Sequence, residues 1–251
     1  MMGYSVFCFL WDGVLVDSGF LHAWDALRHF LKGKRVDVLL HTHAHEDHAG
    51  NSAAIIRTKG ADAPAPGILA EALAHPERDH YRWFRTMTWG APPEPCLARI
   101  MDGDVVSVGN RRFRYVPTPG HCPAHHVVFE ETTRTMFTGD LYLAPVVRFA
   151  SRHEDLGRTI ASLRKAAALE PEIMFDSHLG ALDDPIRRLN ERADNMEAVQ
   201  DRVLELDAQG LEPREITRLV LGNENHLSWI TRGDFKKQNV VWSFLKGKGG
   251  V

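Results

Sequence analysis

Short apolar runs alternate with helical patterns over residues 4–180 of the chain. Residues 6–10 and 14–17 flank a Trp-Asp-Gly sequence, which predicts a β-hairpin. The continuous apolar run at 36–40 is typical of a fully buried strand. Five further strand-like runs follow, at residues 104–108, 113–117, 126–130, 135–138 and 173–176. Alternating strands and helices of this kind predict a layered α/β sandwich.

Helical patterns separate these strand-like runs and then dominate the end of the chain. Three of them show apolar residues at helical spacing, at residues 20–31, 49–59 and 155–168. After Pro185 the pattern is helical almost to the end, with expected stops at Gly210 and Gly222. The sequence therefore predicts a helical extension after the sandwich.

Residues 60–95 have a different texture, because prolines punctuate two short helical patterns at 68–74 and 77–87. We interpret this segment as an insertion, and a lid over the site is one role for it. The expected organisation is a sandwich domain over residues 1–184 and a helical extension over residues 185–251 that packs against it.

The composition is that of an ordinary globular protein with one unusual feature. The 251 residues carry a net charge of −3, with 44% hydrophobic and 25% charged residues, which argues against a long disordered chain and a generally basic nucleic-acid binder. Histidine is abundant, with 14 residues. The three cysteines, Cys8, Cys96 and Cys122, suit neither a disulfide framework nor a Cys-x-x-Cys zinc site. A metal site would therefore use histidine and carboxylate.

The chain has no run of about 18 apolar residues, the length that a membrane helix requires. The apolar start of the chain has no preceding Lys or Arg and is interrupted by Asp12, so we expect a buried strand there and no signal peptide. Together with the unpaired cysteines, this predicts a cytoplasmic protein without a membrane partner.

The segment that carries chemistry contains His43, His45, Asp47 and His48. Composition alone gives roughly 0.006 expected occurrences of this pattern, so chance is a poor explanation. The segment lies between a buried-strand pattern and a helical one, where α/β folds place their sites. In extended backbone His43 and His45 point the same way, whereas Asp47 and His48 begin the following turn. One short segment can thus supply two adjacent metal positions.

Further ligands are needed, because a catalytic zinc takes about three protein ligands and keeps a position open for water. Three residues occur where predicted strands end, namely His121, Asp140 and His178. A carboxylate such as that of Asp140 can bridge two metal ions and hold them about 3.5 to 4 Å apart. The candidate set is therefore five histidines and two aspartates.

This motif order resembles the metallo-β-lactamase superfamily, over about residues 7–180, and Asp17 resembles the aspartate that supports the metal ligands in that family. The resemblance implies a four-layer αββα sandwich, with the C-terminal helical extension added to it. It also implies two divalent metal ions, with zinc expected and iron or manganese as alternatives. In the implied assignment metal one takes His43, His45 and His121, metal two takes Asp47, His48 and His178, and Asp140 bridges them.

The presence of Asp140 makes the chain look closer to the glyoxalase II and lactonase branches than to the β-lactam-degrading members, which usually lack this aspartate. The leading hypothesis is a dinuclear metal-dependent hydrolase in which a metal-bridging hydroxide cleaves a small thioester, ester or lactone. Asp47 would orient the water and take up its proton, as the catalytic residue. Candidate contacts to the small-molecule substrate are Tyr142, Arg148, His226 and Trp229.

Two alternatives remain open. One is a ribonuclease Z-like phosphodiesterase, although the net charge of −3 does not favour a nucleic-acid substrate. The other is a metal-dependent binding or regulatory module that uses the helical tail. A homo-oligomer is compatible with the sequence, which does not specify the oligomeric state. Nor does it specify whether the insertion or the tail gates the site.

Overall fold

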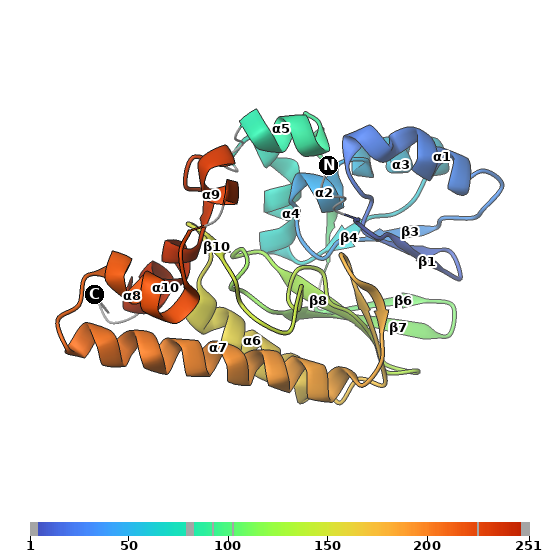
Figure 1. Ribbon diagram of the computed structural model, residues 1–251. Helices are drawn as coiled ribbons and strands as arrows, with labels where there is room; N and C mark the ends of the chain where they lie inside the picture. Colours follow the sequence, from blue (N-terminus) through green and yellow to red (C-terminus); the bar gives the residue numbers. More distant parts are fainter. Residues whose placement is uncertain (1–4, 79–82, 92, 102, 225, 247–251) are drawn as a thin grey trace. The chain divides into compact units, whose positions relative to one another are not determined.

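The computed structural model describes residues 5–78, 83–91, 93–101, 103–224 and 226–246 (Figure 1). The chain forms two compact units. The first contains residues 1–117, 124–143 and 171–184, and the second contains residues 118–123, 144–170 and 185–251. Each unit is described by itself below. Among the described residues, no helix is both long and apolar enough to cross a membrane.

The first unit contains a three-stranded sheet built from the N-terminal hairpin and the strand that precedes the histidine motif. Its strands are β1 (Phe9–Trp11), β2 (Val14–Val16) and β3 (Val38–Leu40). The pair β1 and β2 is antiparallel, as the hairpin pattern predicts, whereas β2 and β3 are parallel. Asp12 and Gly13 both have positive φ at the turn, where Gly13 adopts this conformation at little steric cost.

A six-stranded sheet forms the second layer of this unit, in the order β12-β11-β9-β8-β7-β6. All neighbouring pairs are antiparallel except β9 and β11, which are parallel. The strands are β6 (Val105–Val108), β7 (Arg111–Pro117), β8 (His126–Glu130), β9 (Thr135–Phe137), β11 (Ile173–Asp176) and β12 (Gly180–Leu182). The sequence predicted all of these strands except β12.

Side-chain alternation along β2 and β3 produces the layers. Leu15 and Leu39 belong to a cluster with residues of the helices, whereas Val14, Val16 and Leu40 belong to a cluster with residues of the six-stranded sheet. Because successive side chains of a strand point to opposite faces, one short strand can serve two cores. The three-stranded sheet is therefore packed on both sides.

The helices of the first unit match most of the helical patterns. They are α1 (Trp24–Phe30), α2 (Glu46–Ala49), α3 (Ser52–Lys59), α4 (Gly67–Ala74) and α5 (Trp83–Trp89), with 3-10 turns η1 (Leu21–Ala23) and η2 (Pro76–Arg78). Within the insertion, α4 agrees with the pattern at 68–74, but the pattern at 77–87 gives η2 and α5. Part of that predicted helix, residues 79–82, lies outside the described residues. Two short strands, β4 (Pro64–Ala65) and β5 (Arg99–Ile100), pair beside the insertion.

The second unit is mostly helical. In Figure 1 the long helix α7 (Pro185–Ala208) runs beside α6 (Leu156–Ala167). Asp155 caps α6 by accepting a hydrogen bond from the Arg158 backbone N–H at 3.0 Å. The remaining elements are α8 (Pro213–Leu221), α9 (His226–Ile230), α10 (Lys237–Lys246) and the strand pair β10 (Ala150–Ser151) and β13 (Phe235–Lys236). Residues 144–170 group with the later helices. The domain boundary expected at residue 184 stays a prediction.

Candidate metal centre

The histidine motif forms the connection between β3 and α2. His43 and His48 are fully buried, and Asp47 is 7% exposed. The rings of His43 and His48 lie 4.0 Å apart between centroids, and those of His43 and His45 lie 4.6 Å apart. Nε2 of His43 is 3.0 Å from Nδ1 of His45. The three histidine rings of this segment therefore lie together and are not spread over the surface.

Asp140 and His178 follow β9 and β11, which are parallel neighbours in the six-stranded sheet. The carboxyl ends of parallel strands meet at the same edge of a sheet, and this edge brings the two side chains together. Oδ1 of Asp140 lies 3.1 Å from Nε2 of His178 and 3.2 Å from Nε2 of His48. The predicted bridging carboxylate thus stands between two predicted ligands.

Two sets of side chains within the first unit have ligand atoms close enough to hold a metal ion. One set is His43, His48 and Asp140, and the other is Asp47, His48 and His178. In the second set Oδ2 of Asp47 lies 3.7 Å from Nε2 of His48 and 3.8 Å from Nε2 of His178. The six predicted ligands of this unit therefore form one continuous group around Asp140 and His48.

The ring nitrogens indicate that this group is built for a cation. Nδ1 of His48 donates a hydrogen bond to Asp17 at 2.9 Å, and Nδ1 of His178 donates one to the Ser5 carbonyl at 2.9 Å. In a neutral ring, Nε2 then carries a lone pair, and both Nε2 atoms face carboxylate oxygens. The buried Nε2 of His48 has no hydrogen bond to any residue that the structure describes. Imidazole and carboxylate donors in this arrangement fit divalent metal ions.

The electrostatics of the metal-free site support the same interpretation. Burial lowers the pKa of His48 and of His178, but the negative charge on Asp140 and Asp47 outweighs it. The pKa of His48 is raised well above its ordinary value, and that of His178 is raised to about 9. In the metal-free protein, protonation of His48 and His178 therefore supplies the positive charge that balances Asp140 and Asp47.

His121, the remaining predicted ligand, lies in segment 118–123, which belongs to the second unit. Within that unit its Nδ1 is 3.3 Å from Oε1 of Glu154. Both ends of the segment, Pro117 and Ala124, belong to the first unit. Its role as a ligand remains a prediction.

Asp17 supports the motif from the end of β2. Its carboxylate accepts hydrogen bonds from the Thr42 backbone N–H and the Thr42 hydroxyl, both at 2.8 Å, as well as from His48. Asp17 has a φ of 57°, a left-handed conformation that aspartate tolerates better than most residues. One carboxylate thus fixes the backbone before His43 and the ring of His48.

The four predicted substrate contacts are divided between the two units. Tyr142 belongs to the first unit and is 1% exposed. Arg148, His226 and Trp229 belong to the second unit and are exposed, with Trp229 at 84%. Their contact with substrate remains a prediction.

Sequence reasoning missed three buried residues beside the ligands. His125, assigned only to the start of a strand, accepts a hydrogen bond at Nε2 from the Asp140 backbone N–H at 3.1 Å. Asp176, the last residue of β11, accepts hydrogen bonds from the loops that carry Asp140 and His178. Glu46 lies inside the motif and pairs with Arg85 of α5. Two of them had a local signal in the sequence, since Glu46 lies within the histidine motif and Asp176 precedes Ser177 and His178.

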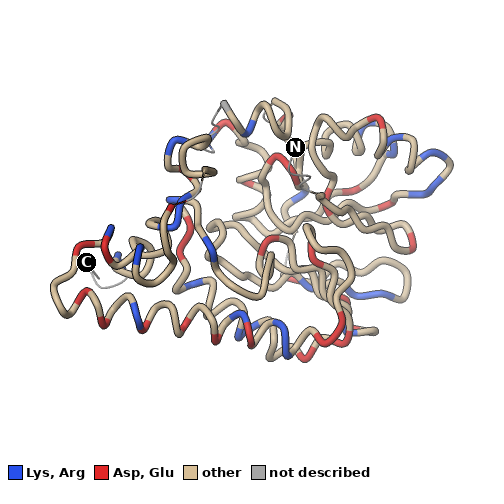
Figure 2. Tube along the Cα trace, in the orientation of Figure 1, with Lys and Arg blue, Asp and Glu red and all other residues tan. Residues whose placement is uncertain are grey.

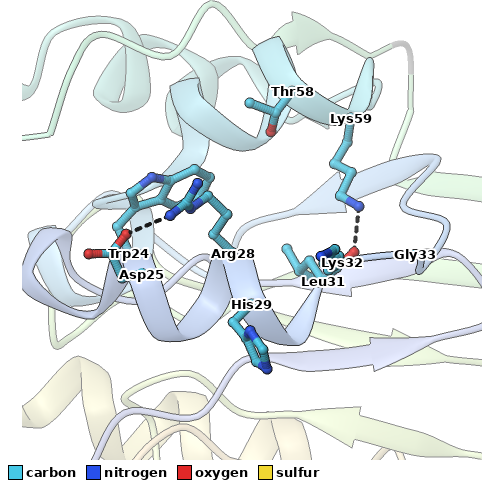
Figure 3. A pocket seen from close by; sticks show the side chains of 9 residues that line it. All are labelled: Trp24, Asp25, Arg28, His29, Leu31, Lys32, Gly33, Thr58 and Lys59. Atoms are coloured by element: carbon cyan, nitrogen blue, oxygen red, sulfur yellow. Dashed lines mark hydrogen bonds and ion pairs between the residues drawn. The ribbon is translucent and has the colours of Figure 1, made fainter.

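A hollow of about 540 Å³ beside α1 and α3 is not part of this group. Figure 3 shows Arg28, Lys32 and Lys59 around it, and Lys59 donates a hydrogen bond to the Leu31 carbonyl. None of the predicted metal ligands lines it. The chemistry-bearing side chains therefore lie elsewhere in the unit.

Comparison with known proteins identifies the family of this chain. The family model described as the metallo-beta-lactamase superfamily matches residues 6–178. An atrochrysone carboxyl ACP thioesterase of Aspergillus fumigatus is 27% identical over 201 residues, covering 77% of this chain and 55% of the relative. The chain thus spans about half the length of that relative. A hydroxyacylglutathione hydrolase of Rhodospirillum rubrum is 28% identical over 204 residues, covering 80% of this chain and 71% of the relative.

Solved structures show the same fold. A metallo-beta-lactamase family protein from Thermus thermophilus superposes with a TM-score of 0.69 at 21% identity, covering 96% of this chain and 88% of that protein. This likeness confirms the predicted fold class, including the helical C-terminal region. The named activities among the sequence relatives are hydrolytic, in agreement with the predicted hydrolase class. The family model spans well over half of the sequence, and the chain belongs to the metallo-beta-lactamase superfamily.

Proposed function

We propose that this protein is a dinuclear metal-dependent hydrolase that cleaves a small thioester, with esters and lactones as related substrates. The observation that carries the proposal is the convergence of His48 and His178 on one oxygen of Asp140, at 3.2 and 3.1 Å. Two ring nitrogens that face one carboxylate oxygen favour positive charge between them, which protons supply in the metal-free protein and a bound metal ion would supply in the active form. Because His43, His45 and Asp47 adjoin this group, the site has donors for a second ion.

In the proposed site, His43, His45 and His121 would hold the first ion, Asp47, His48 and His178 would hold the second, and Asp140 would serve both. Bound divalent ions supply hydrolytic water at neutral pH and positive charge for an oxygen on which negative charge develops. Zinc suits this mixture of imidazole and carboxylate, and iron and manganese suit it as well.

The protein's own groups perform the proton transfer. Asp47 is an ionisable carboxylate at the rim of the buried motif, and it accepts the proton of the attacking water. The water oxygen bonds to the carbonyl carbon, the carbon–sulfur bond breaks, and the proton passes from Asp47 to the leaving thiolate. The products are a carboxylic acid and a thiol, so no oxidant or reductant is needed.

Two relatives favour a thioester over the other carbonyl substrates. One is named as a thioesterase that acts on an acyl carrier protein, and the other as a hydroxyacylglutathione hydrolase. Both names describe the cleavage of an acyl group from sulfur. The retention of Asp140 in this chain supports the same branch of the superfamily.

Direct measurement of turnover tests the proposal. The full chain is stripped with a chelator, reloaded with Zn²⁺, Fe²⁺ or Mn²⁺, and assayed on acyl-glutathione, acyl-pantetheine, lactone, β-lactam and phosphodiester substrates. We expect thioester cleavage that depends on metal and falls by at least about 100-fold in Asp140→Asn. Undiminished cleavage by the stripped protein would exclude the mechanism.

Phosphodiester cleavage is the competing reaction of the same site. A nucleic-acid substrate requires a cationic surface, and the net charge is −3. Figure 2 shows acidic and basic residues interspersed along α7, where Arg187 pairs with Glu191 and Arg202 with Glu205. Preferred turnover of phosphodiesters in the same screen would favour the nuclease. Salt-sensitive binding of RNA or DNA without turnover would favour a binding module.

A further inference from the structure

Asp176, a residue outside the predicted ligand set, lies at the centre of the two loops that carry Asp140 and His178. It is the last residue of β11, and its side chain is fully buried. Oδ1 accepts hydrogen bonds from the backbone N–H groups of His178 and Leu179, both at 2.9 Å. Oδ2 accepts one from the Leu143 backbone N–H at 3.1 Å.

A fourth donor reaches the same carboxylate from the end of β9. The Thr138 hydroxyl lies 3.2 Å from Oδ2 of Asp176 and 3.4 Å from two carbonyl oxygens, so Asp176 is its nearest acceptor. Thr138 and Leu143 bracket the turn that contains Asp140. Oδ1 therefore organises the turn that presents His178, and Oδ2 organises the turn that presents Asp140.

We propose that Asp176 is a positioning residue for the second metal ion, because one rigid carboxylate sets the relative placement of His178 and Asp140. The proposal rests on the proposed dinuclear function. A buried carboxylate that accepts four hydrogen bonds holds both turns in a fixed arrangement. Groups that orient metal ligands typically change metal affinity by 10- to 100-fold when they are removed.

Substitution by asparagine separates this role from simple packing. The amide has the same shape as the carboxylate, but its nitrogen donates a hydrogen bond and cannot accept one. In one orientation this nitrogen faces the backbone N–H groups of His178 and Leu179. In the other orientation it faces the Thr138 hydroxyl and the Leu143 backbone N–H. Asp176→Asn therefore releases one of the two turns whichever way the amide is oriented. The remaining contacts of β11 with β9 and β12 are unchanged.

Glu130 provides a matched control. It is also a fully buried carboxylate at the end of a strand of the same sheet, and it accepts hydrogen bonds from Thr132 and Thr133. The turn that it organises joins β8 to β9 and carries none of the predicted ligands. Glu130→Gln thus introduces the same chemical change into a turn that has no role at the metal site.

The experiment is a titration of stripped full-length protein with Co²⁺ or Zn²⁺ against a chelating indicator, which counts ions and measures each affinity. We expect the wild type and Glu130→Gln to bind two ions alike. In Asp176→Asn we expect the second ion, which uses both His178 and Asp140, to bind about 10- to 100-fold more weakly, and the first ion, which uses only Asp140 of this pair, to be weakened less. The Co²⁺ absorption of the second site should change in parallel, a readout independent of turnover.

The outcomes distinguish the two hypotheses. Two ions bound by Asp176→Asn with wild-type affinities would overturn the role of Asp176 and leave the proposed function intact. A wild type that binds fewer than two ions would overturn the dinuclear site itself. If Asp176→Asn does not fold, Thr138→Val removes only one donor, and we expect it to weaken the second ion about fivefold. An unchanged second site in Thr138→Val would then refute the proposal.

Discussion

Nδ1 of His48 lies 2.9 Å from Oδ2 of Asp17, and both groups are fully buried. Because a carboxylate can only accept, Nδ1 carries the proton of this hydrogen bond. Nε2 is then the atom that faces Asp140 and Asp47. This single contact determines which nitrogen of His48 is available to a metal ion.

Asp17→Asn should weaken metal binding by about 10- to 100-fold while leaving the fold intact. If the amide nitrogen faces His48, the ring loses the acceptor that fixes its tautomer. If it faces the Thr42 backbone N–H instead, the backbone before His43 loses its acceptor. Titration with Zn²⁺ measures the change. Asp12→Asn is the control, since Asp12 pairs with Arg111 at the surface. Equal affinities in wild type and Asp17→Asn would contradict the role assigned to Asp17.

Metal loading should release protons, about two per molecule at pH 7. The pKa of His48 is well above its ordinary value and that of His178 is about 9 in the metal-free protein, whereas a metal ligand must be unprotonated. Calorimetry in buffers of different ionisation enthalpy measures the release. The number of protons released should diminish as the pH approaches 9. A number that does not vary with pH would contradict the raised pKa values of His48 and His178.

The same pKa values predict how the metal-free protein responds to pH. A histidine whose pKa is raised by folding stabilises the folded state below its ordinary pKa of about 6.5, and this contribution is lost as the pH rises through the folded value. For His178 the window extends from about 6.5 to about 9. The metal-free protein should therefore lose stability to denaturant over this range, and metal-loaded protein should lose less.

Arg85→Met should destabilise the fold by about 3 kcal/mol. Glu46 is 1% exposed, and Arg85 donates two hydrogen bonds to it, including one at 2.6 Å. Burial raises the pKa of Glu46, and the charge of Arg85 opposes this, so the variant leaves an uncompensated buried carboxylate. Denaturant unfolding of metal-free protein measures the loss.

The loss should increase as the pH rises above the ordinary pKa of a glutamate, because a carboxyl group with a raised pKa favours the folded state only while it is protonated. The double variant Glu46→Gln with Arg85→Met should recover most of the stability, since no charge remains buried. A double variant as unstable as Arg85→Met would show that the arginine acts through packing instead.

Gly139→Ala should lower the free energy of unfolding more than alanine does at a left-handed glycine with open space around it. Gly139 has a φ of 53°, and an added Cβ would lie 2.7 Å from Nε2 of His125 and from the side chain of Thr42. Gly109→Ala is the matched control, with a φ of 60° and open space around it. We expect about 1 kcal/mol of destabilisation in the control and at least about 2 kcal/mol more in Gly139→Ala. Thermal unfolding with and without Zn²⁺ compares them, and equal losses would contradict the steric argument.

The sequence by itself determined the residue types of the site and their local setting. A buried run at 36–40 followed by His43, His45, Asp47 and His48 predicted a strand that ends in a metal-binding loop, and β3 and α2 have this arrangement. Periodicity also predicted most strands of the six-stranded sheet, because alternating burial is encoded residue by residue. The helical pattern at 77–87 corresponds to η2 and α5 among the described residues, and residues 79–82 lie outside them.

Only the tertiary structure decided which distant residues hold the ligands in place. His125 reaches Asp140, Asp176 joins two turns, and Arg85 reaches Glu46, although none of these pairs has a recognisable spacing. Their contacts depend on strand order and register, most directly on β9 and β11 being parallel neighbours. Pattern along a chain specifies which face of a strand is buried, but it does not specify which other strand lies beside it. The candidate ligands and the supporting Asp17 could therefore be proposed from sequence, whereas His125, Asp176 and Arg85 could not.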